Sequence, residues 1–433
     1  MIALPANDLN KNEPVGQLPP RDWMAWPETL AVVAALAAKG TEVRFVGGCV
    51  RDSLIDRPVR DIDIATPDRP EQVLALLAAA GVRAIPTGIA HGTVTAVVGE
   101  RKYEITTLRR DVETDGRHAR VAFTDDWGAD AARRDFTINA LYCRPDGAIY
   151  DPFEGIPDLA AGRVRFIGDA SARIDEDVLR LLRYFRFYAW YGRPPADVDA
   201  LAACRANASR LATLSGERLY AEFMKILASP DPAGACVMMQ GEHVLAALLP
   251  EAQWIGRLRA LSFLESRGLA RATVRPDPLR RLAALIEADG AQIAAIAERF
   301  KLSRAEAERL SDLVATVDRP AAGMDAAAAR RLLHGLGADR FRDRVLLHWA
   351  AVRDRGEHGH ARDTRLWTDL LDQADAWVPQ PLPVDGKDVV ARGIQPGPRV
   401  GEILILLETW WQDSDFRANR ADGLAKLDEI LKV

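Results

Sequence analysis

Two aspartates separated by one residue, Asp61 and Asp63, are the residues of this chain whose types and spacing point most directly to chemistry. They fall in a short run, residues 60–65, that is predicted to be a strand, and side chains two apart on a strand point to the same side of the sheet. Two carboxylates this close repel each other unless a cation neutralises them. Mg²⁺ takes oxygen ligands and usually keeps substrate phosphates in its shell, so the pair predicts a magnesium site beside bound phosphate.

A phosphate-binding turn is predicted just upstream of this pair. The β-branched run of residues 41–46 predicts a strand that stops at Gly47 and Gly48, where the freedom of glycine at positive φ allows a tight turn into a helix. Exposed N–H groups at the start of that helix suit an anion, and Arg51, one turn past Gly48, would donate to a phosphate oxygen. Taken alone, the glycines fit an ordinary turn and the aspartates a solvated sheet edge. Their combination at this spacing favours a site.

A predicted helix over residues 175–191 carries four polar residues at intervals of three: Asp177, Arg180, Arg183 and Arg186. Residues at this interval share a helix face. Because a carboxylate only accepts hydrogen bonds and a guanidinium only donates them, Asp177 and Arg180 together fit a base edge with one donor beside one acceptor. Cytosine and adenine present such an edge, whereas uracil and guanine reverse it, and a reversed edge can be refused by a factor of ~10⁴ to 10⁵. The alternative is that Asp177 and Arg180 form a weak salt bridge with each other.

Several segments together resemble a known family. The run Gly-Gly-x-Val-Arg-Asp at residues 47–52, followed by Asp-x-Asp, is similar to the head of the class II tRNA nucleotidyltransferases, the CCA-adding enzymes, and of the related bacterial poly(A) polymerases. The match extends over about residues 40–228. Four more segments follow in the order of the family: RRDFTINAL at 133–141, DPFEG at 151–155, EDVLRLLRYFRF at 176–187, and Glu217-Arg218 with Glu222.

The resemblance implies roles for further residues. It implies that Arg134 lies near the nucleotide and Asp135 near the ribose 2′-hydroxyl, with a surface ion pair as the alternative. It also implies a third carboxylate from a neighbouring strand, for which Glu104 is the positional candidate. Glu104 fits equally well as an exposed partner of Arg109.

The activity implied by the resemblance is the addition of C, C and A to the 3′ end of tRNA from CTP and ATP, without a nucleic-acid template. In two-metal nucleotidyl transfer, one cation activates the attacking hydroxyl and the other stabilises the departing pyrophosphate. Two alternatives stay open: a poly(A) polymerase of the same family, and a non-catalytic RNA-binding relative that kept the fold. The sequence leaves the oligomeric state open.

The composition agrees with a multi-domain cytoplasmic enzyme. At 433 residues with 48% hydrophobic content, the chain is long enough for two to four domains. Its four cysteines show no CxxC spacing, which favours a reducing compartment and disfavours zinc. No apolar run approaches the roughly 18 residues of a membrane span. The net charge of −5 means that any tRNA contact must come from a local basic surface.

The predicted fold class is α+β. An N-terminal nucleotidyltransferase head with a mixed sheet and helices precedes an all-helical neck, body and tail, because the apolar period becomes 3.6 from about residue 170. A polar stretch at 109–125 is predicted to be a mobile loop. The predicted divisions are a disordered leader at 1–22, the head at 23–150, the neck with the base-selecting helix at 151–230, the body at 231–320 and a tRNA-binding tail at 321–433.

Arginines of the C-terminal half form two groups in the sequence. They would either follow the phosphates of a tRNA or lie on solvated helix faces. The first group is Arg257, Arg259, Arg267, Arg271, Arg275, Arg280 and Arg281, and the second is Arg330, Arg331, Arg340, Arg342 and Arg344.

Overall fold

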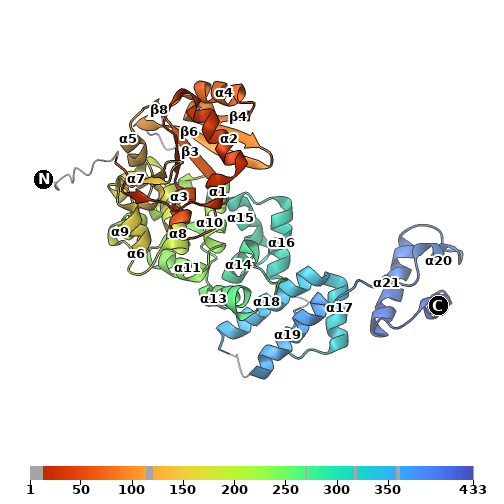
Figure 1. Cartoon of the computed structure of the whole chain (residues 1–433). Helices are drawn as coiled ribbons and strands as arrows, with labels where there is room; N and C mark the ends of the chain where they lie inside the picture. Colours follow the sequence, from red (N-terminus) through yellow and green to blue (C-terminus); the bar gives the residue numbers. More distant parts are fainter. Residues whose placement is uncertain (1–12, 114–119, 270, 316–318, 357–360, 433) are drawn as a thin grey trace. The chain divides into compact units, whose positions relative to one another are not determined.

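The structure, a computed structural model, describes residues 13–113, 120–269, 271–315, 319–356 and 361–432 (Figure 1). The chain divides into two compact units, Met1–Pro250 and Glu251–Val433. All strands among the described residues belong to the first unit. Among the same residues, no helix combines the length and apolar character that crossing a bilayer requires.

The first unit contains an eight-stranded mixed sheet in the order β1-β10-β9-β2-β3-β6-β5-β4. Its neighbours run antiparallel except β3 and β6, which are parallel. The mixed sheet predicted for the head is therefore confirmed. The strands are β1 Gly16–Gln17, β2 Arg44–Val46, β3 Ile62–Thr66, β4 Arg83–Gly88, β5 Thr93–Val98, β6 Arg101–Thr107, β9 Tyr142–Cys143 and β10 Ala148–Tyr150.

Strand β3 lies in the middle of this sheet, between β2 and β6, and its apolar residues are buried. Ile62 and Ile64 are almost fully buried, and Asp63, between them, points to the opposite face. Helix α4 (Pro70–Ala79) packs against β4 and β5, and α3 (Gly48–Leu54) packs against β2 and β3. The sheet thus places the turn that follows β2 beside Asp63, because β2 and β3 are adjacent strands.

Part of the predicted disordered leader is ordered. Residues 1–12 lie outside the described residues, but Gly16 and Gln17 pair with β10 as the edge strand β1, and Leu18 is buried. Helix α1 (Asp22–Ala25) follows directly. The prediction of disorder is wrong for residues 16–22, because pairing with a sheet edge orders a segment whose composition carries no strand pattern.

The predicted loop at 109–125 is also partly regular. Strands β7 (Arg109–Glu113) and β8 (Arg120–Phe123) form a two-stranded antiparallel sheet. The polar sequence of this stretch carries no apolar period, which is why it predicted a loop. The run Asp115-Gly116-Arg117-His118 lies outside the described residues.

The helix predicted over residues 175–191 is two helices. Helix α7 ends at Glu176, α8 begins at Leu179, and Asp177 between them is extended with φ −154°. The Asp177 carboxylate accepts a hydrogen bond from the Leu179 N–H at 3.1 Å, a local bond that competes with continuous helix. The helices of this unit beyond the sheet are α5 Trp127–Ala132, α6 Gly155–Ala161, α7 Ala170–Glu176, α8 Leu179–Tyr191, α9 Val198–Asn207, α10 Gly216–Leu227, α11 Pro232–Gly241 and α12 Val244–Leu248.

The second unit is helical, as predicted for the C-terminal part of the chain. Its main core gathers around the stacked rings of Trp349 and Trp367, and a smaller core lies among α20, α21 and α22. A capping box formed by Ser303 and Glu306 begins α16. The boundaries between head, neck, body and tail remain predictions. The helices are α13 Ile255–Phe263, α14 Pro278–Leu285, α15 Gly290–Phe300, α16 Arg304–Val314, α17 Ala326–Leu336, α18 Ala338–Asp354, α19 Ala361–Asp375, α20 Gly386–Val390, α21 Pro398–Asp413 and α22 Arg420–Ile430.

Candidate functional site

A cleft of about 640 Å³ in the first unit brings most of the predicted site residues together. Arginines and aspartates from four separate segments line it, and aromatic side chains of α8 close one side. Asp177 and Arg180 are not among its described lining residues. The predicted residues that line the cleft are Gly48, Arg51, Asp61, Asp63, Arg134, Asp135, Arg183 and Arg186.

The glycine turn has the predicted conformation. Gly47 has φ 71° and caps α3, whose first residue is Gly48. A side chain at Gly47 would be strained by this φ, although the nearest atom, Arg134 Nη1, lies 3.7 Å from the point that its Cβ would occupy. Since α3 has only seven residues, anion binding at this end of the cleft depends mainly on the arginines around it.

The aspartate pair carries negative charge that the chain does not neutralise. Asp63 is partly buried in β3, and Asp61 is exposed at the residue before the strand. Glu104 is the register partner of Asp63 on the parallel strand β6, so both carboxylates extend from the same face of the sheet. Burial, the nearby Glu104 and Asp61 together raise the pKa of Asp63 to about 6, although Arg134 opposes the shift.

This arrangement fits a divalent cation, because a cation at the cleft would favour the ionised form of Asp63 against burial and against repulsion by Glu104 and Asp61. Among the described residues, no group of three or more histidine, cysteine or acidic side chains is arranged to hold a metal. The chain therefore offers two carboxylates directly, and Glu104 as a third ligand stays a prediction.

Arg51 is held in place on two sides. Its Nη1 donates to Asn139 Oδ1 at 2.5 Å, and its Nε donates to Asp52 Oδ1 at 2.9 Å. The guanidinium carbon also lies 4.2 Å from the ring centre of Tyr191, whose hydroxyl donates to Asp52. The side chain is only 8% exposed, so its orientation is set before any ligand binds.

Arg134 lies between a tyrosine and a buried aspartate. Its Nε donates to Tyr142 Oη at 3.1 Å, and its Nη2 donates to Asp130 Oδ2 at 3.2 Å. Burial alone would raise the pKa of Asp130, but Arg134, Arg133 and the Tyr142 hydroxyl lower it to about 2. Arg133, the other arginine of the motif, pairs with the same carboxylate.

Asp135 joins the motif after β8 to helix α8. Its Oδ2 accepts a hydrogen bond from Arg183 Nε at 2.6 Å, and its Oδ1 accepts from Asn139 Nδ2 at 2.9 Å. Burial opposes ionisation, yet Arg183 and Asn139 hold the pKa of Asp135 below its ordinary value. The carboxylate is thus ionised and oriented at the cleft wall.

The helix α8 side of the cleft has an excess of positive charge. The guanidinium carbons of Arg51, Arg183 and Arg186 lie 5.3, 5.4 and 4.4 Å from the ring centre of Phe187. Burial and the neighbouring Arg183 lower the pKa of Arg186, even though its Nε lies 3.1 Å from Glu222. Crowded arginines of this kind suit a polyanion such as a triphosphate.

Asp177 and Arg180 do not pair with each other, so the predicted salt bridge between them is wrong. Asp177 is bound by Arg218 Nη2 at 2.8 Å, and Arg180 Nη1 donates to Glu176. The physical reason is the break between α7 and α8, which removes Asp177 from the helix that carries Arg180. The predicted common line of four polar residues therefore holds only for the three arginines of α8.

Three residues that orient the cleft were missed by the sequence reasoning: Asp130, Asn139 and Tyr142. Asp130 precedes Arg134 by four residues, a spacing that brings side chains together on a helix and could have been noticed. Asn139 lies inside a motif that was recognised, but nothing in its type showed that it would bond both Arg51 and Asp135. No local signal identifies Tyr142, which comes from the strand β9.

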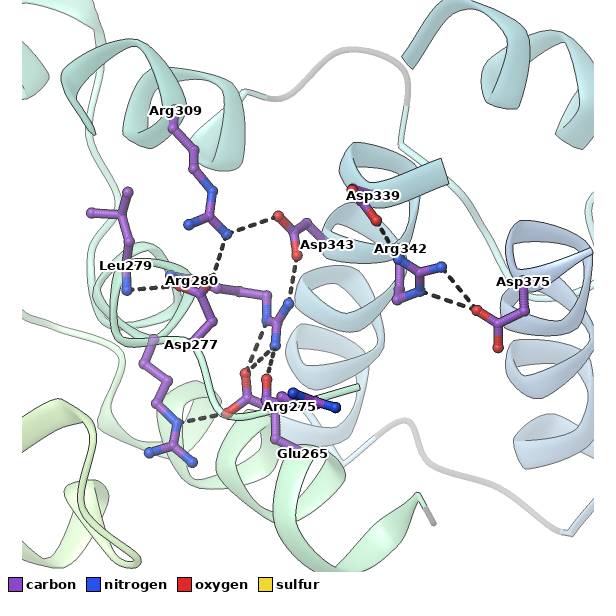
Figure 2. A network of polar contacts seen from close by, with 11 residues as sticks. Glu265, Arg275, Asp277, Leu279, Arg280, Arg309, Asp339, Arg342, Asp343 and Asp375 are labelled. Carbon is purple, nitrogen blue, oxygen red and sulfur yellow. Dashed lines mark hydrogen bonds and ion pairs between the residues drawn. The ribbon is translucent and has the colours of Figure 1, made fainter. Parts of the chain in front are cut away.

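The arginine groups of the second unit form a different kind of structure. Arg280 and Arg281 are buried and share the carboxylate of Glu265. Arg280 Nη1 also contacts Asp343 at 2.5 Å (Figure 2). Both predictions for such residues, a phosphate-binding surface and a solvated helix face, are wrong here because acids from neighbouring helices neutralise them. The same applies to Arg342 and Arg344, which pair with Asp375 and Asp312. Arg259, Arg267 and Arg275 are exposed.

Comparison with known proteins places these features in a family context. A family model described as the poly A polymerase head domain matches residues 43–165, and one described as a probable RNA and SrmB-binding site of polymerase A matches residues 197–255. The chain is 36% identical over 394 residues to the CCA tRNA nucleotidyltransferase 1, mitochondrial, of Danio rerio, covering 90% of this chain and 87% of that protein. It is 30% identical over 384 residues to a CCA-adding enzyme of Lactobacillus delbrueckii subsp. bulgaricus, covering 87% and 91%.

Solved structures of CCA-adding enzymes are similar in fold to this chain. The Bacillus stearothermophilus CCA-adding enzyme in complex with CTP superposes with a TM-score of 0.75 at 29% identity, covering 94% of this chain and 97% of that chain. The Thermotoga maritima CCA-adding enzyme in complex with a tRNA shares the fold, with a TM-score of 0.64 at 19% identity and coverage of 95% and 98%.

Proposed function

The chain belongs to the CCA-adding tRNA nucleotidyltransferases, and from this membership we propose that it adds C, C and A to the 3′ end of tRNA, using CTP and ATP and releasing pyrophosphate. The observation that carries the proposal is the cleft in which Asp61 and Asp63 face a group of arginines. Unneutralised carboxylates beside clustered guanidinium groups are what a metal-bound triphosphate requires.

We infer that Asp61 and Asp63 hold Mg²⁺. When bound, two such ions would lower the pKa of the attacking 3′-hydroxyl and stabilise the charge on the departing pyrophosphate. Asp63 lies in β3 and Asp61 directly precedes that strand, so the packed sheet anchors the pair while substrates exchange.

The arginines take the phosphates and Asp135 takes the sugar. Arg51, Arg134 and Arg186 line the cleft, and hydrogen bonds or ion pairs with the chain orient each guanidinium. Such preorganisation means that little side-chain freedom is lost when the triphosphate binds. Asp135, oriented by Arg183 and Asn139, is suited to accept a hydrogen bond from a ribose hydroxyl.

Selection of the base is assigned to Asp177 and Arg180, acting by hydrogen bonding to cytosine and adenine. These residues are bound to Arg218 and Glu176, so base recognition requires that they exchange these partners for the base edge. Arg180→Ala should then lower the ratio of kcat/KM for CTP over UTP by about tenfold or more. Arg173→Gln, which removes the other arginine paired with Glu176, is the control and should keep the ratio. An unchanged ratio in Arg180→Ala would show that Arg180 does not take part in base selection.

The decisive experiment measures incorporation of each of the four nucleoside triphosphates into a tRNA that lacks its terminal three nucleotides. We expect two C and one A, dependence on a divalent cation, and no incorporation from UTP or GTP. Continued addition of A from ATP alone would instead identify a poly(A) polymerase, and tRNA binding without incorporation would identify a non-catalytic relative.

The cytoplasmic location remains a proposal. All four cysteines are free and buried, which agrees with a reducing compartment, while the related proteins of Danio rerio and Mus musculus are named as mitochondrial. Cell fractionation would decide between the two compartments.

A further inference from the structure

We propose that Asp130 is a positioning residue of the nucleotide site, which fixes the guanidinium of Arg134 so that its remaining donors face the cleft. The inference deepens the proposed function and rests on it. Asp130 itself does not line the cleft among the described residues, so its effect on the nucleotide must pass through Arg134.

Donors from three elements converge on the Asp130 carboxylate. Oδ2 accepts from Arg134 Nη2 at 3.2 Å and from the Tyr142 hydroxyl at 2.7 Å. Oδ1 accepts from Arg133 Nε at 2.9 Å and from the backbone N–H of Arg109 at 3.4 Å. The Asp130 side chain is 1% exposed, so each of these bonds forms away from competing water.

The bonds define which part of Arg134 is available to a ligand. Nε donates to Tyr142 Oη, and Nη2 donates to Asp130. Because the Tyr142 hydroxyl accepts from Arg134 and donates to Asp130, the three groups form a closed ring of hydrogen bonds that sets the plane of the guanidinium. Nη1 is left facing the glycine turn, 3.7 Å from the place where a Cβ on Gly47 would lie.

A purely structural role for Asp130 makes a different prediction, and the chain supplies the control that separates the two. Arg133 forms a salt bridge with the same carboxylate at 2.8 Å, but it does not line the cleft among the described residues. Removing Arg133 therefore weakens the ion cluster without touching the group that faces the nucleotide. Only the loss of Asp130 or Tyr142 releases Arg134.

The test uses the full-length protein with three single variants, Asp130→Asn, Tyr142→Phe and Arg133→Gln, together with Arg134→Gln and the double variant Asp130→Asn/Arg134→Gln. Steady-state incorporation into tRNA gives kcat and KM for CTP and ATP, and equilibrium dialysis of CTP with Mg²⁺ gives its Kd independently of turnover. Asp130→Asn should raise the KM and Kd for CTP by about tenfold to a hundredfold with the KM for tRNA unchanged. Tyr142→Phe should shift the same quantities in the same direction by a smaller factor, and Arg133→Gln should leave them within about twofold.

The double variant gives the sharpest outcome. If Asp130 acts through Arg134, the double variant binds CTP no more weakly than Arg134→Gln alone. Full additivity of the two losses, or wild-type CTP affinity in Asp130→Asn while Arg134→Gln is impaired, would overturn the inference. If Asp130→Asn does not fold, Tyr142→Phe decides by the same criterion. A wild type that binds CTP but incorporates no nucleotide would overturn the proposed function, and the CTP affinities would still decide the role of Asp130.

Discussion

The arginines of the cleft and those of the second unit are paired with acids in opposite ways. In the cleft, Arg134 is bound to the chain through Nε and Nη2, while its Nη1 faces the glycine turn. In the second unit, Arg280 donates Nε and Nη2 to Glu265, Nη1 to Asp343, and Nη2 also to a backbone carbonyl (Figure 2). The first arrangement leaves donors for a ligand, whereas the second uses them to join helices.

The carboxylates of the two regions also differ, in how far nearby arginines offset their negative charge. Asp63 in the cleft has a pKa raised to about 6, because burial disfavours its charged form and the nearby Glu104 and Asp61 add to the shift, against Arg134 and Arg51. Glu265 is 4% exposed and surrounded by the guanidinium groups of Arg280 and Arg281. Incomplete compensation of charge therefore distinguishes a binding site from a structural network better than the presence of charged residues does.

The largest effect should come from the uncompensated acid. Asp63→Asn should lower nucleotide incorporation by more than about a thousandfold, because a neutral amide is a poor ligand for Mg²⁺. In a chelator, the same variant should melt above the wild type at pH 8, since a carboxylate with a raised pKa costs stability when it is ionised. Incorporation assays and thermal melting measure the two effects. Activity within tenfold of the wild type would show that Asp63 is not a metal ligand.

The corresponding substitution in the second unit is Glu265→Gln, which removes a fully paired acid. It leaves two buried guanidinium groups without a counter-charge, which should reduce the free energy of unfolding by about 3 to 5 kcal/mol. At a temperature where the variant stays folded, kcat and KM for CTP should match the wild type. Denaturant unfolding followed by fluorescence measures the loss. An unchanged unfolding midpoint would mean that the network does not stabilise the unit.

Asp130 in the first unit is a buried acid paired with arginines, as Glu265 is in the second unit, and its response to pH differs from that of Asp63. Its pKa of about 2 in the folded chain lies below the ordinary 3.8, so the ionised form stabilises the fold by about 2 kcal/mol above the ordinary pKa. That contribution is lost as the pH falls from about 4 towards 2. The difference in unfolding free energy between the wild type and Asp130→Asn should therefore be constant from pH 7 to 5 and shrink below pH 4. A difference that grows on acidification would contradict the ion pairs with Arg133 and Arg134.

The parts of the cleft that depend on neighbouring residues could be predicted from the sequence, whereas the roles of these residues stay predictions. The glycine turn and the spacing of Asp61 and Asp63 depend on neighbours in the chain, and the sheet then places both where they were expected. The mixed sheet and the helical remainder followed from apolar periods of the same local kind.

The contacts between distant segments could not be predicted, because they depend on which helices and strands pack together. Asp177 is separated from Arg180 by a helix break that one side-chain hydrogen bond helps to form, and Tyr142 reaches Asp130 only after β9 joins the sheet. Arg280 and the exposed Arg275 are five residues apart in one basic group, yet one is buried in a network and the other is not. Residue type and spacing do not tell which acid will lie opposite an arginine.

The smallest effect should come from an ion pair that is exposed to water and contacts no ligand. Arg304 Nε lies 2.7 Å from Glu308 on α16, with side chains 92% and 64% exposed. Arg304→Ala should change the free energy of unfolding by less than about 0.5 kcal/mol and leave incorporation unchanged, because water and salt screen an exposed pair. Denaturant unfolding at low and high salt measures this change beside Glu265→Gln. A loss as large as that of Glu265→Gln would mean that burial does not explain the difference between the charged groups of this molecule.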